Sequence, residues 1–127
     1  MKRFLLIDDD DIICIVHPAI IQQTFPGSFV EIIQSSEEAI EYLNEVSMMN
    51  EPIPDAVFLD INLPQLNGFD ILNKLSESAQ QWLKQTKIYM LSSSIDERDM
   101  ERVKENPLIH SFVGKPLTVE FLKENFS

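Results

Sequence analysis

Hydrophobic and polar positions divide the chain into two kinds of segment that alternate. Short runs of mainly Ile, Val, Leu and Phe are separated by longer segments in which apolar residues recur with helical spacing. The short runs predict five strands, at residues 4–7, 29–33, 56–59, 88–91 and 109–113. The runs at 4–7 and 56–59 are apolar throughout, which is typical of strands buried on both faces of a parallel sheet.

The longer segments predict five helices. They cover about 11–25, the residues from the N-cap Ser35 or Ser36 to Val46, about 69–79 after a Pro-x-x-x-Gly turn, about 96–105, and about 118–126. The first of them contains Pro18, which has no N–H to donate to the carbonyl of Cys14. We therefore expect a kink or an interruption there.

This alternation predicts one α/β domain over residues 1–127, with a five-stranded parallel sheet and helices on both faces. The domain uses the whole sequence, so we expect no second domain. No apolar run of about 18 residues and no signal peptide is present, so we expect a cytoplasmic protein that does not enter a membrane.

The charge is strongly negative and unevenly distributed. The net charge is −11, and residues 4–73 contain no Lys or Arg while holding 13 of the 21 acidic residues. This balance argues against a nucleic-acid surface, which needs clustered basic residues. Two interpretations stay open: a solvated acidic face, or an acidic group that holds a hard cation.

Polar residues follow four of the predicted strands. They are Asp8–Asp11, Asp60, Ser92 and Lys115. Because parallel strands present their carboxyl ends at one edge of a sheet, where ligands bind, we expect these side chains to converge. Clustered carboxylates repel unless a cation neutralises them, and oxygen ligands suit Mg²⁺. A carboxylate can also act as a nucleophile toward phosphorus.

Each of these residues also has a purely structural interpretation. Asp10 or Asp11 can cap the first helix, and Asp60 can bind its own backbone. Ser92 can belong to an ordinary polar loop, and Lys115 can be solvated. The combination at four strand ends is what favours a functional site.

Four segments carry a family resemblance that covers essentially the whole chain. They are FLLIDDDD at 4–11, FLDINLPQLNGFDIL at 58–72, YMLSSS at 89–94 and FVGKPL at 112–117. With these segments the chain resembles the receiver domain of two-component response regulators. The resemblance implies a flavodoxin-like sheet with strand order 2-1-3-4-5.

The resemblance also implies roles for particular residues. Asp60 would be the phosphoacceptor, receiving a phosphoryl group from the phosphohistidine of a sensor histidine kinase or a histidine phosphotransfer protein. Asp9 would bind Mg²⁺ directly and Asp8 mainly through water. Asp60 itself and the backbone carbonyl of Asn62 would complete the protein ligands.

Two further residues would respond to the phosphoryl group. Ser92 would donate a hydrogen bond to one phosphoryl oxygen, and Lys115 would form an ion pair with another. Movement of Ser92 would be coupled to Phe112, which stands where tyrosine is frequent and so cannot form a hydrogen bond from its ring. Such a protein is not an enzyme acting on a separate substrate. It catalyses its own phosphorylation and dephosphorylation, and signals through a downstream protein or a phosphorelay.

The main alternative is a phosphohydrolase of the haloacid dehalogenase type. Its Asp-x-Asp motif would be Asp8 and Asp10, with Asp8 as the nucleophile. That family needs a further acidic pair after the lysine, and only two acids of the last predicted helix follow Lys115. This alternative also leaves Asp60 unexplained. A flavin mononucleotide carrier is disfavoured because four aspartates would repel its phosphate.

Histidine and cysteine offer no further chemistry at the level of sequence. His17 precedes a proline in a predicted helix and His110 lies in a predicted strand, so both are interpreted as structural or surface residues. Cys14 is the single cysteine and cannot form an internal disulfide. The spacing of these residues does not support a zinc site.

Overall fold

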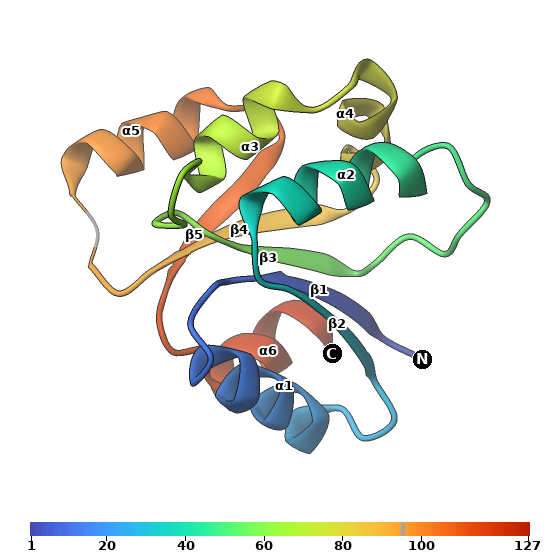
Figure 1. Cartoon of the computed structure of the whole chain (residues 1–127). Coiled ribbons are helices and arrows are strands. Elements are labelled where there is room, and N and C mark those ends of the chain that lie inside the picture. The colour runs from blue at the N-terminus through green and yellow to red at the C-terminus, as the bar shows by residue number, and fades with distance from the viewer. Residues whose placement is uncertain (95) are drawn as a thin grey trace.

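The computed structural model describes residues 1–94 and 96–127. These residues form three layers, in which one sheet lies between two layers of helices (Figure 1). The strands are β1 (Arg3–Ile7), β2 (Phe29–Ile33), β3 (Ala56–Asp60), β4 (Lys87–Ser92) and β5 (Ile109–Gly114). They are parallel and lie in the order β2-β1-β3-β4-β5. The predicted class and strand order are thus confirmed, and each strand differs from its predicted range by no more than its end residues.

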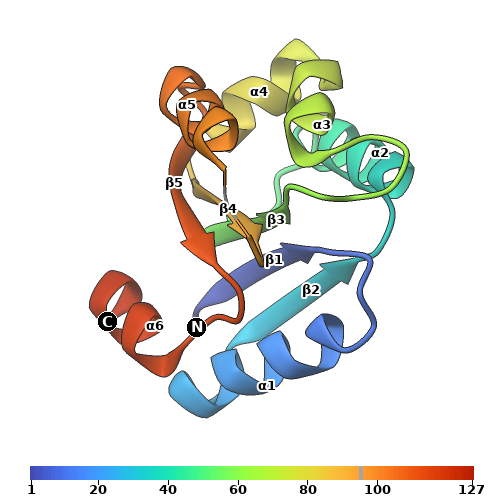
Figure 2. The ribbon, with the colours of Figure 1, turned by 90° about the vertical axis from the view of Figure 1, so that its left-hand side faces the viewer.

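Helices cover both faces of the sheet. One face carries α1 (Ile13–Thr24) and α6 (Val119–Phe126), and the other carries α2 (Ser36–Val46), α3 (Gly68–Lys74), α4 (Glu77–Leu83) and α5 (Glu97–Glu105) (Figure 2). None of the helices in the described part of the chain has the length and apolar character needed to cross a bilayer.

Strand β1 contributes to both apolar cores. Phe4 and Leu6 belong to the core beneath α1 and α6, whereas Leu5 and Ile7 belong to the core beneath the other helices. Successive side chains of a strand point to opposite faces, so a strand covered on both sides must be apolar at every position. This explains the uninterrupted apolar run at residues 4–7.

The predicted helix over residues 69–79 is in fact two helices, α3 and α4. The four residues predicted to share one buried face are all buried: Phe69, Leu72, Leu75 and Ala79. The backbone nevertheless becomes extended at Leu75, and the Ser76 hydroxyl accepts a hydrogen bond from the Ala79 N–H at 3.2 Å. The Ser76 N–H donates to Asn44 Oδ1 in α2 at 2.9 Å. Ser76 therefore starts a new helix, because its own N–H is bound outside the first one.

Of the kink or interruption predicted at Pro18, the interruption is wrong. Helix α1 runs continuously over its 12 residues with Pro18 inside it. Pro18 removes one backbone donor, but the neighbouring turns continue on either side of it. His17 and Ile21, one turn apart, are both fully buried, so packing against the sheet holds the helix together across the missing bond.

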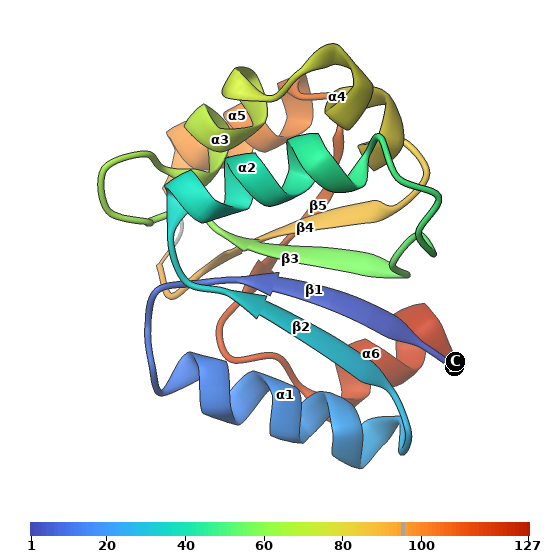
Figure 3. The same ribbon diagram turned by 45° about the vertical axis from the view of Figure 1, so that its right-hand side comes forward.

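The carboxyl ends of the strands meet at one edge of the sheet. Figure 3 shows the connections that leave β1, β2 and β3 gathered on the left-hand side of the molecule. Residues 7 and 59 are paired, as are residues 60 and 91, and residues 92 and 114. The polar residues that follow these strands are therefore brought close together, as the sequence predicts.

Candidate functional site

Three carboxylates form a cluster at this edge. Asp8 follows β1, Asp9 comes next, and Asp60 is the last residue of β3; one carboxylate oxygen of each lies within 4.8 Å of those of the others. Asp8 and Asp60 are buried, whereas Asp9 is exposed. Lys115, after β5, places its Nζ 2.7 Å from Asp8 Oδ2 and 3.3 Å from Asp60 Oδ2.

The two buried carboxylates are oriented in the same way. Asp8 Oδ1 accepts a hydrogen bond from the Asp10 N–H at 2.9 Å, and Asp60 Oδ1 accepts one from the Asn62 N–H at 3.0 Å. In each case the other oxygen, Oδ2, is the one that faces Lys115. A backbone turn thus holds one oxygen of each aspartate, and the ammonium group holds the other.

The loop between β1 and α1 is built from further aspartate turns. Asp10 Oδ1 accepts hydrogen bonds from the Ile12 N–H at 2.8 Å and the Ile13 N–H at 3.4 Å, just before the first helical residues. The N-cap of α1 is Ile12, which has no side-chain cap, so Asp10 stabilises the turn before the helix and the prediction that Asp10 or Asp11 caps it is wrong. The Cys14 thiol donates to the Asp8 carbonyl at 3.2 Å. Burial, together with Asp8 and its neighbours, raises the pKa of this thiol to about 11, so it stays protonated.

The loop after β3 is drawn tightly against the strand. The Gly68 N–H donates to the Ile61 carbonyl at 3.0 Å, and Asn67 and Asp70 form a capping box at the start of α3. A Cβ at Gly68 would lie 2.8 Å from the Asp60 carbonyl oxygen and 2.7 Å from Met90 Cε. Only glycine lets α3 approach the backbone of the candidate phosphoacceptor this closely.

Burial sets the ionisation of Asp60. It raises the pKa of this carboxyl above its usual value, and the Asn62 N–H opposes the change by stabilising the charged form. The neighbouring Asp8 raises the pKa further, whereas Lys115 lowers it. Any cation that entered the cluster would lower the pKa of Asp60 and favour the nucleophilic carboxylate.

Lys115 remains an ammonium in this environment. Burial alone lowers its pKa, but the hydrogen bond to Asp8 and the charges of Asp60 and Asp8 outweigh that effect, so its pKa is raised. The side chain is 12% exposed, so the positive charge sits between two buried negative ones rather than in bulk water. The group can therefore neutralise charge that develops on Asp60.

The remaining predicted residues lie nearby but not all within the cluster. Ser92 is buried at the end of β4, and its hydroxyl donates to the Ser94 carbonyl and accepts from the Ser94 N–H at 3.2 Å. Its carbonyl accepts a hydrogen bond from the Lys115 N–H at 2.9 Å. Asn62 is exposed, and Phe112 is half-buried in β5 against the core beneath α2–α5.

His17 is the residue near the site whose environment the sequence does not reveal. It is fully buried in α1, and its Nε2 accepts a hydrogen bond from the Leu117 N–H at 3.1 Å. Burial lowers its pKa from 6.5 to about 4, so the imidazole is neutral at neutral pH. The interpretation of His17 as a structural or surface residue was too broad. A lone histidine in an apolar stripe carries no local signal of what its nitrogens contact.

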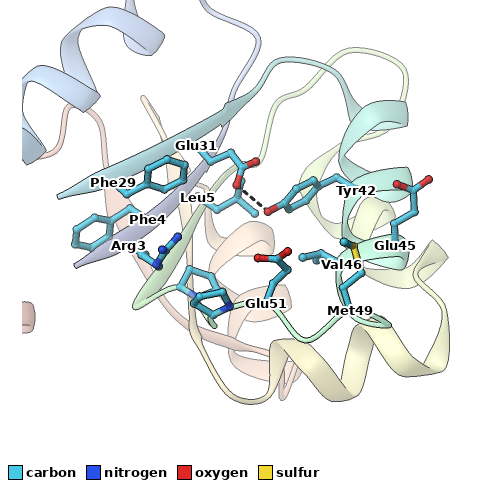
Figure 4. A pocket seen from close by; sticks show the side chains of 12 residues that line it. Arg3, Phe4, Leu5, Phe29, Glu31, Tyr42, Glu45, Val46, Met49 and Glu51 are labelled. Atoms are coloured by element: carbon cyan, nitrogen blue, oxygen red, sulfur yellow. Dashed lines mark hydrogen bonds between the residues drawn. The ribbon is translucent and has the colours of Figure 1, made fainter. Parts of the chain in front are cut away.

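A pocket of about 330 Å³ lies away from this cluster, between α2 and the first residues of β1 and β2 (Figure 4). Tyr42 donates a hydrogen bond to Glu31 across it at 2.7 Å. Arg3 lies over the ring of Phe29 at its edge, with its guanidinium carbon 5.2 Å from the ring centroid. The carboxylate cluster and this cavity thus lie at opposite edges of the sheet, the cluster at the carboxyl ends of the strands and the cavity at their amino ends.

The fold and the cluster together define a class of signalling domain. The family model described as "Response regulator receiver domain" matches residues 4–127. The chain therefore belongs to the response regulator receiver domain family, which is consistent with a part in two-component signalling. The haloacid dehalogenase alternative finds no support in this match.

Two proteins illustrate how similar the relatives are. The crystal structure of a two component response regulator from Cytophaga hutchinsonii is 30% identical, with a TM-score of 0.88 over 99% of this chain and 94% of that one. The protein named "Probable methanogenesis regulatory protein FilR2", from Methanothrix harundinacea, is 26% identical over 123 residues, which are 94% of this chain and 75% of that protein. Two further curated relatives are longer, and the chain covers only 40% and 51% of them.

A more distant structure shares the fold. It is the receiver domain of the sensor histidine kinase PA1611 from Pseudomonas aeruginosa, described with a magnesium ion coordinated in its active-site cleft. It is 18% identical to this chain, with a TM-score of 0.67 over 97% of this chain and 92% of that one. At this identity the likeness shows a common fold.

Proposed function

We propose that this chain is a response regulator that accepts a phosphoryl group on Asp60. The observation that carries the proposal is the position of this carboxylate. Asp60 is buried at the carboxyl end of a central strand, one oxygen is held by the Asn62 N–H, and the other faces Lys115 at 3.3 Å. A carboxylate held in this way beside a cation is arranged for in-line attack on phosphorus.

The proposed step forms one bond and breaks one. A carboxylate oxygen of Asp60 attacks the phosphorus of a phosphohistidine on the donor protein. The P–N bond breaks, its electron pair stays with the imidazole nitrogen, and the imidazole leaves with a proton taken from the surroundings. The product is an acyl phosphate on Asp60, and water later hydrolyses it. The chain therefore acts as a phosphoacceptor that catalyses its own phosphorylation and dephosphorylation.

The acidic cluster fits a divalent cation, and we infer that this cation is Mg²⁺. The side chains of Asp8, Asp9 and Asp60 and the backbone carbonyl of Asn62 would hold it, and all of these are oxygen donors, which Mg²⁺ prefers. When bound, Mg²⁺ neutralises the carboxylates and the oxygens of the phosphoryl group. The magnesium-containing relative described above supports this assignment.

Lys115 and Ser92 would sense the new group. Phosphorylation adds negative charge on Asp60, to which the Lys115 ammonium already lies close. The Ser92 hydroxyl now donates to the Ser94 carbonyl, so donation to a phosphoryl oxygen requires it to rotate away from that partner. Phe112, in the neighbouring strand, would respond to this movement by repacking.

The donor and the target are proteins in this proposal. A sensor histidine kinase or a histidine phosphotransfer protein would supply the phosphoryl group, and an unidentified downstream protein or a phosphorelay would receive the signal. Ile12 and Ile15 are 69% and 72% exposed at the start of α1, directly after the acidic loop. Their apolar surface beside Asp9 suits a protein partner, whereas the net charge of −11 disfavours nucleic acid.

The test is the intact mass of the protein after incubation with acetyl phosphate, with and without Mg²⁺. We expect a Mg²⁺-dependent gain of one phosphoryl group that is lost in Asp60→Asn. Asp11→Asn is the matched control, since Asp11 is an exposed aspartate of the same acidic loop. Its carboxylate accepts a hydrogen bond from the Gln34 side chain, away from the cluster of Asp8, Asp9 and Asp60. This variant should be labelled like the wild type.

Other outcomes would contradict the proposal. Labelling that persists in Asp60→Asn would place the phosphoryl group on another residue. Release of free phosphate without a gain in mass would favour a phosphohydrolase if that release persists in Asp60→Asn.

A further inference from the structure

The segment that carries Lys115 is held at both ends by hydrogen bonds from its backbone. The Lys115 N–H donates to the Ser92 carbonyl at the end of β4, at 2.9 Å. Two residues later, the buried Leu117 N–H donates to His17 Nε2 in α1, at 3.1 Å. Pro116, between them, has no N–H. The donors on either side of Pro116 thus attach the segment to two different elements, β4 and α1.

The contact with His17 spans the fold. It joins residues 100 positions apart, and both are among the most deeply buried in the chain, at 0% exposed for His17 and 1% for Leu117. His17 is the only side chain that the described residues offer to the Leu117 N–H as an acceptor. Helix α1 therefore helps to hold the backbone of the segment that carries Lys115. From this segment the Lys115 side chain reaches Asp8 and Asp60.

The imidazole must be neutral to make this contact. Nε2 accepts a hydrogen bond, so the single proton of the ring lies on Nδ1, which is buried and has no hydrogen-bond partner among the described residues. Burial lowers the pKa of His17, and Lys115 lowers it further, whereas Asp8 raises it. The acceptor nitrogen is therefore free of a proton at neutral pH.

We propose that His17 is a positioning residue for Lys115. Its Nε2 fixes the Leu117 N–H, and through it the backbone that aims the lysine between Asp8 and Asp60. This role rests on the function proposed above, since it acts on the lysine of that site. It concerns the approach of the ammonium to the carboxylates and not the oxygen donors that would bind Mg²⁺.

Two substitutions separate the hydrogen bond from the volume of the side chain. His17→Leu keeps an apolar side chain of similar reach but removes the acceptor. His17→Gln supplies a neutral amide oxygen at about the distance of Nε2 from the backbone. Ile21→Val and Ile21→Ala are the matched controls, because Ile21 is one turn further along α1, is equally buried and lies in the same apolar core as Leu117, but its side chain offers no hydrogen-bond acceptor.

The first measurement uses the unphosphorylated protein. Nuclear magnetic resonance gives the hydrogen-exchange rate of the Leu117 amide and the Cε and Nζ shifts of Lys115. In His17→Leu we expect faster exchange and shifted Lys115 resonances, and in His17→Gln and the Ile21 variants we expect values near those of the wild type. If the Lys115 resonances of His17→Leu match those of the wild type, His17 does not position the lysine and the inference is wrong.

The second measurement is the rate of labelling by acetyl phosphate per folded molecule, alongside the Mg²⁺ dissociation constant from calorimetry. In His17→Leu we expect labelling to slow by about tenfold to a hundredfold, because misplacing a catalytic group by an ångström has effects of that size. The Mg²⁺ affinity should stay close to that of the wild type, and His17→Gln should recover most of the rate. If labelling slows equally in the Ile21 variants, the slowing in His17→Leu is explained by lost stability and the inference is wrong.

The two measurements keep this inference apart from the proposed function. If the wild type is not labelled at all, the proposed function fails, and the Lys115 resonances still decide whether His17 positions the lysine. If the wild type is labelled and His17→Leu gives the same results as His17→Gln in both measurements, only the positioning role fails.

Discussion

Lys115 occupies the space between two buried carboxylates whose other oxygens are held by backbone N–H groups. Without the ammonium, Asp8 and Asp60 would face one another with no positive charge between them, and their repulsion would raise the pKa of Asp60 further. The same charge would stabilise negative charge that builds up on the transferring phosphoryl group. The positive charge of Lys115 therefore stabilises the unphosphorylated site and would also stabilise the proposed transfer of the phosphoryl group.

Replacement of Lys115 by alanine is expected to affect phosphorylation much more than metal binding. We expect labelling by acetyl phosphate to slow by about a hundredfold in Lys115→Ala, the effect of removing one donor from an electrostatic site. Mg²⁺ affinity should not fall, because the carboxylates remain and a competing cation is gone. Intact-mass kinetics and calorimetry measure the two quantities. Lys123→Ala, which removes an exposed lysine of α6, should change neither.

His17 predicts a component of the dependence of stability on pH. Its pKa is about 4 when folded, against 6.5 ordinarily, so between these values the unfolded chain binds a proton that the folded chain does not. Its contribution to stability is therefore complete above pH 6.5 and is lost as the pH falls toward 4, by about 3 kcal/mol. Asp60, whose folded pKa is raised, acts in the opposite direction.

The comparison of wild type with His17→Gln isolates this component, since Asp60 and the other carboxylates are common to both proteins. Urea unfolding at a series of pH values from 7 to 4 should show a steeper loss of stability in the wild type. Parallel curves for the two proteins would mean that His17 does not titrate in this range.

At the scale of elements, the packing of α3 against the end of β3 determines the surroundings of the Asp60 backbone. Its first residue, Gly68, lies against the Asp60 carbonyl and donates its N–H to the carbonyl of Ile61. The Met90 side chain near Gly68 can move, but the Asp60 carbonyl belongs to a central strand and cannot shift without moving the proposed phosphoacceptor. The distance between α3 and β3 would therefore affect the geometry of the proposed reaction.

Gly68→Ala is expected to lower the free energy of unfolding by about 1–3 kcal/mol, the usual effect of overpacking, and to slow the labelling of Asp60. The added Cβ would be 2.8 Å from the Asp60 carbonyl oxygen. Gly114→Ala is the control, because a Cβ there meets nothing within 4 Å although Gly114 directly precedes Lys115. Denaturant unfolding and intact-mass kinetics test both variants, and equal stability of the two would contradict a tight approach at Gly68.

At the scale of the whole molecule, negative charge dominates. The net charge is −11, and the three clustered carboxylates add local repulsion to this overall effect. A cation bound only by the folded chain would stabilise it by mass action. The same charge also makes the molecule sensitive to ionic strength in general, so the two effects must be measured separately.

Mg²⁺ is expected to raise the stability of the folded chain by about 3 kcal/mol at a hundred times its dissociation constant. Thermal unfolding with MgCl₂, compared with NaCl of equal ionic strength, measures the specific part. Asp9→Asn should abolish most of it, because Asp9 belongs to the cluster but does not form an ion pair with Lys115. If NaCl stabilises as much as MgCl₂, or if Asp9→Asn responds like the wild type, the cluster does not bind the metal specifically.

The sequence by itself determined the five strands and the edge of the sheet at which the polar residues meet, whereas the strand order was implied by the family resemblance. Strands and helices follow from the local alternation of apolar and polar residues, and the polar residues after β1, β3, β4 and β5 share one edge because the strands are parallel. Local patterns were sufficient to locate the strands and the edge of the sheet that holds the site, since polar residues directly follow each of these strands in the chain.

Only the tertiary structure decided the contacts between residues far apart in the sequence. The apolar stripe from Phe69 to Ala79 is continuous, yet Asn44 in α2 captures the Ser76 N–H and the helix divides. Nothing near His17 in the sequence indicates that it accepts a hydrogen bond from Leu117. Such contacts depend on how two elements dock on the sheet, and that docking is set by packing across the whole core and not by local periodicity.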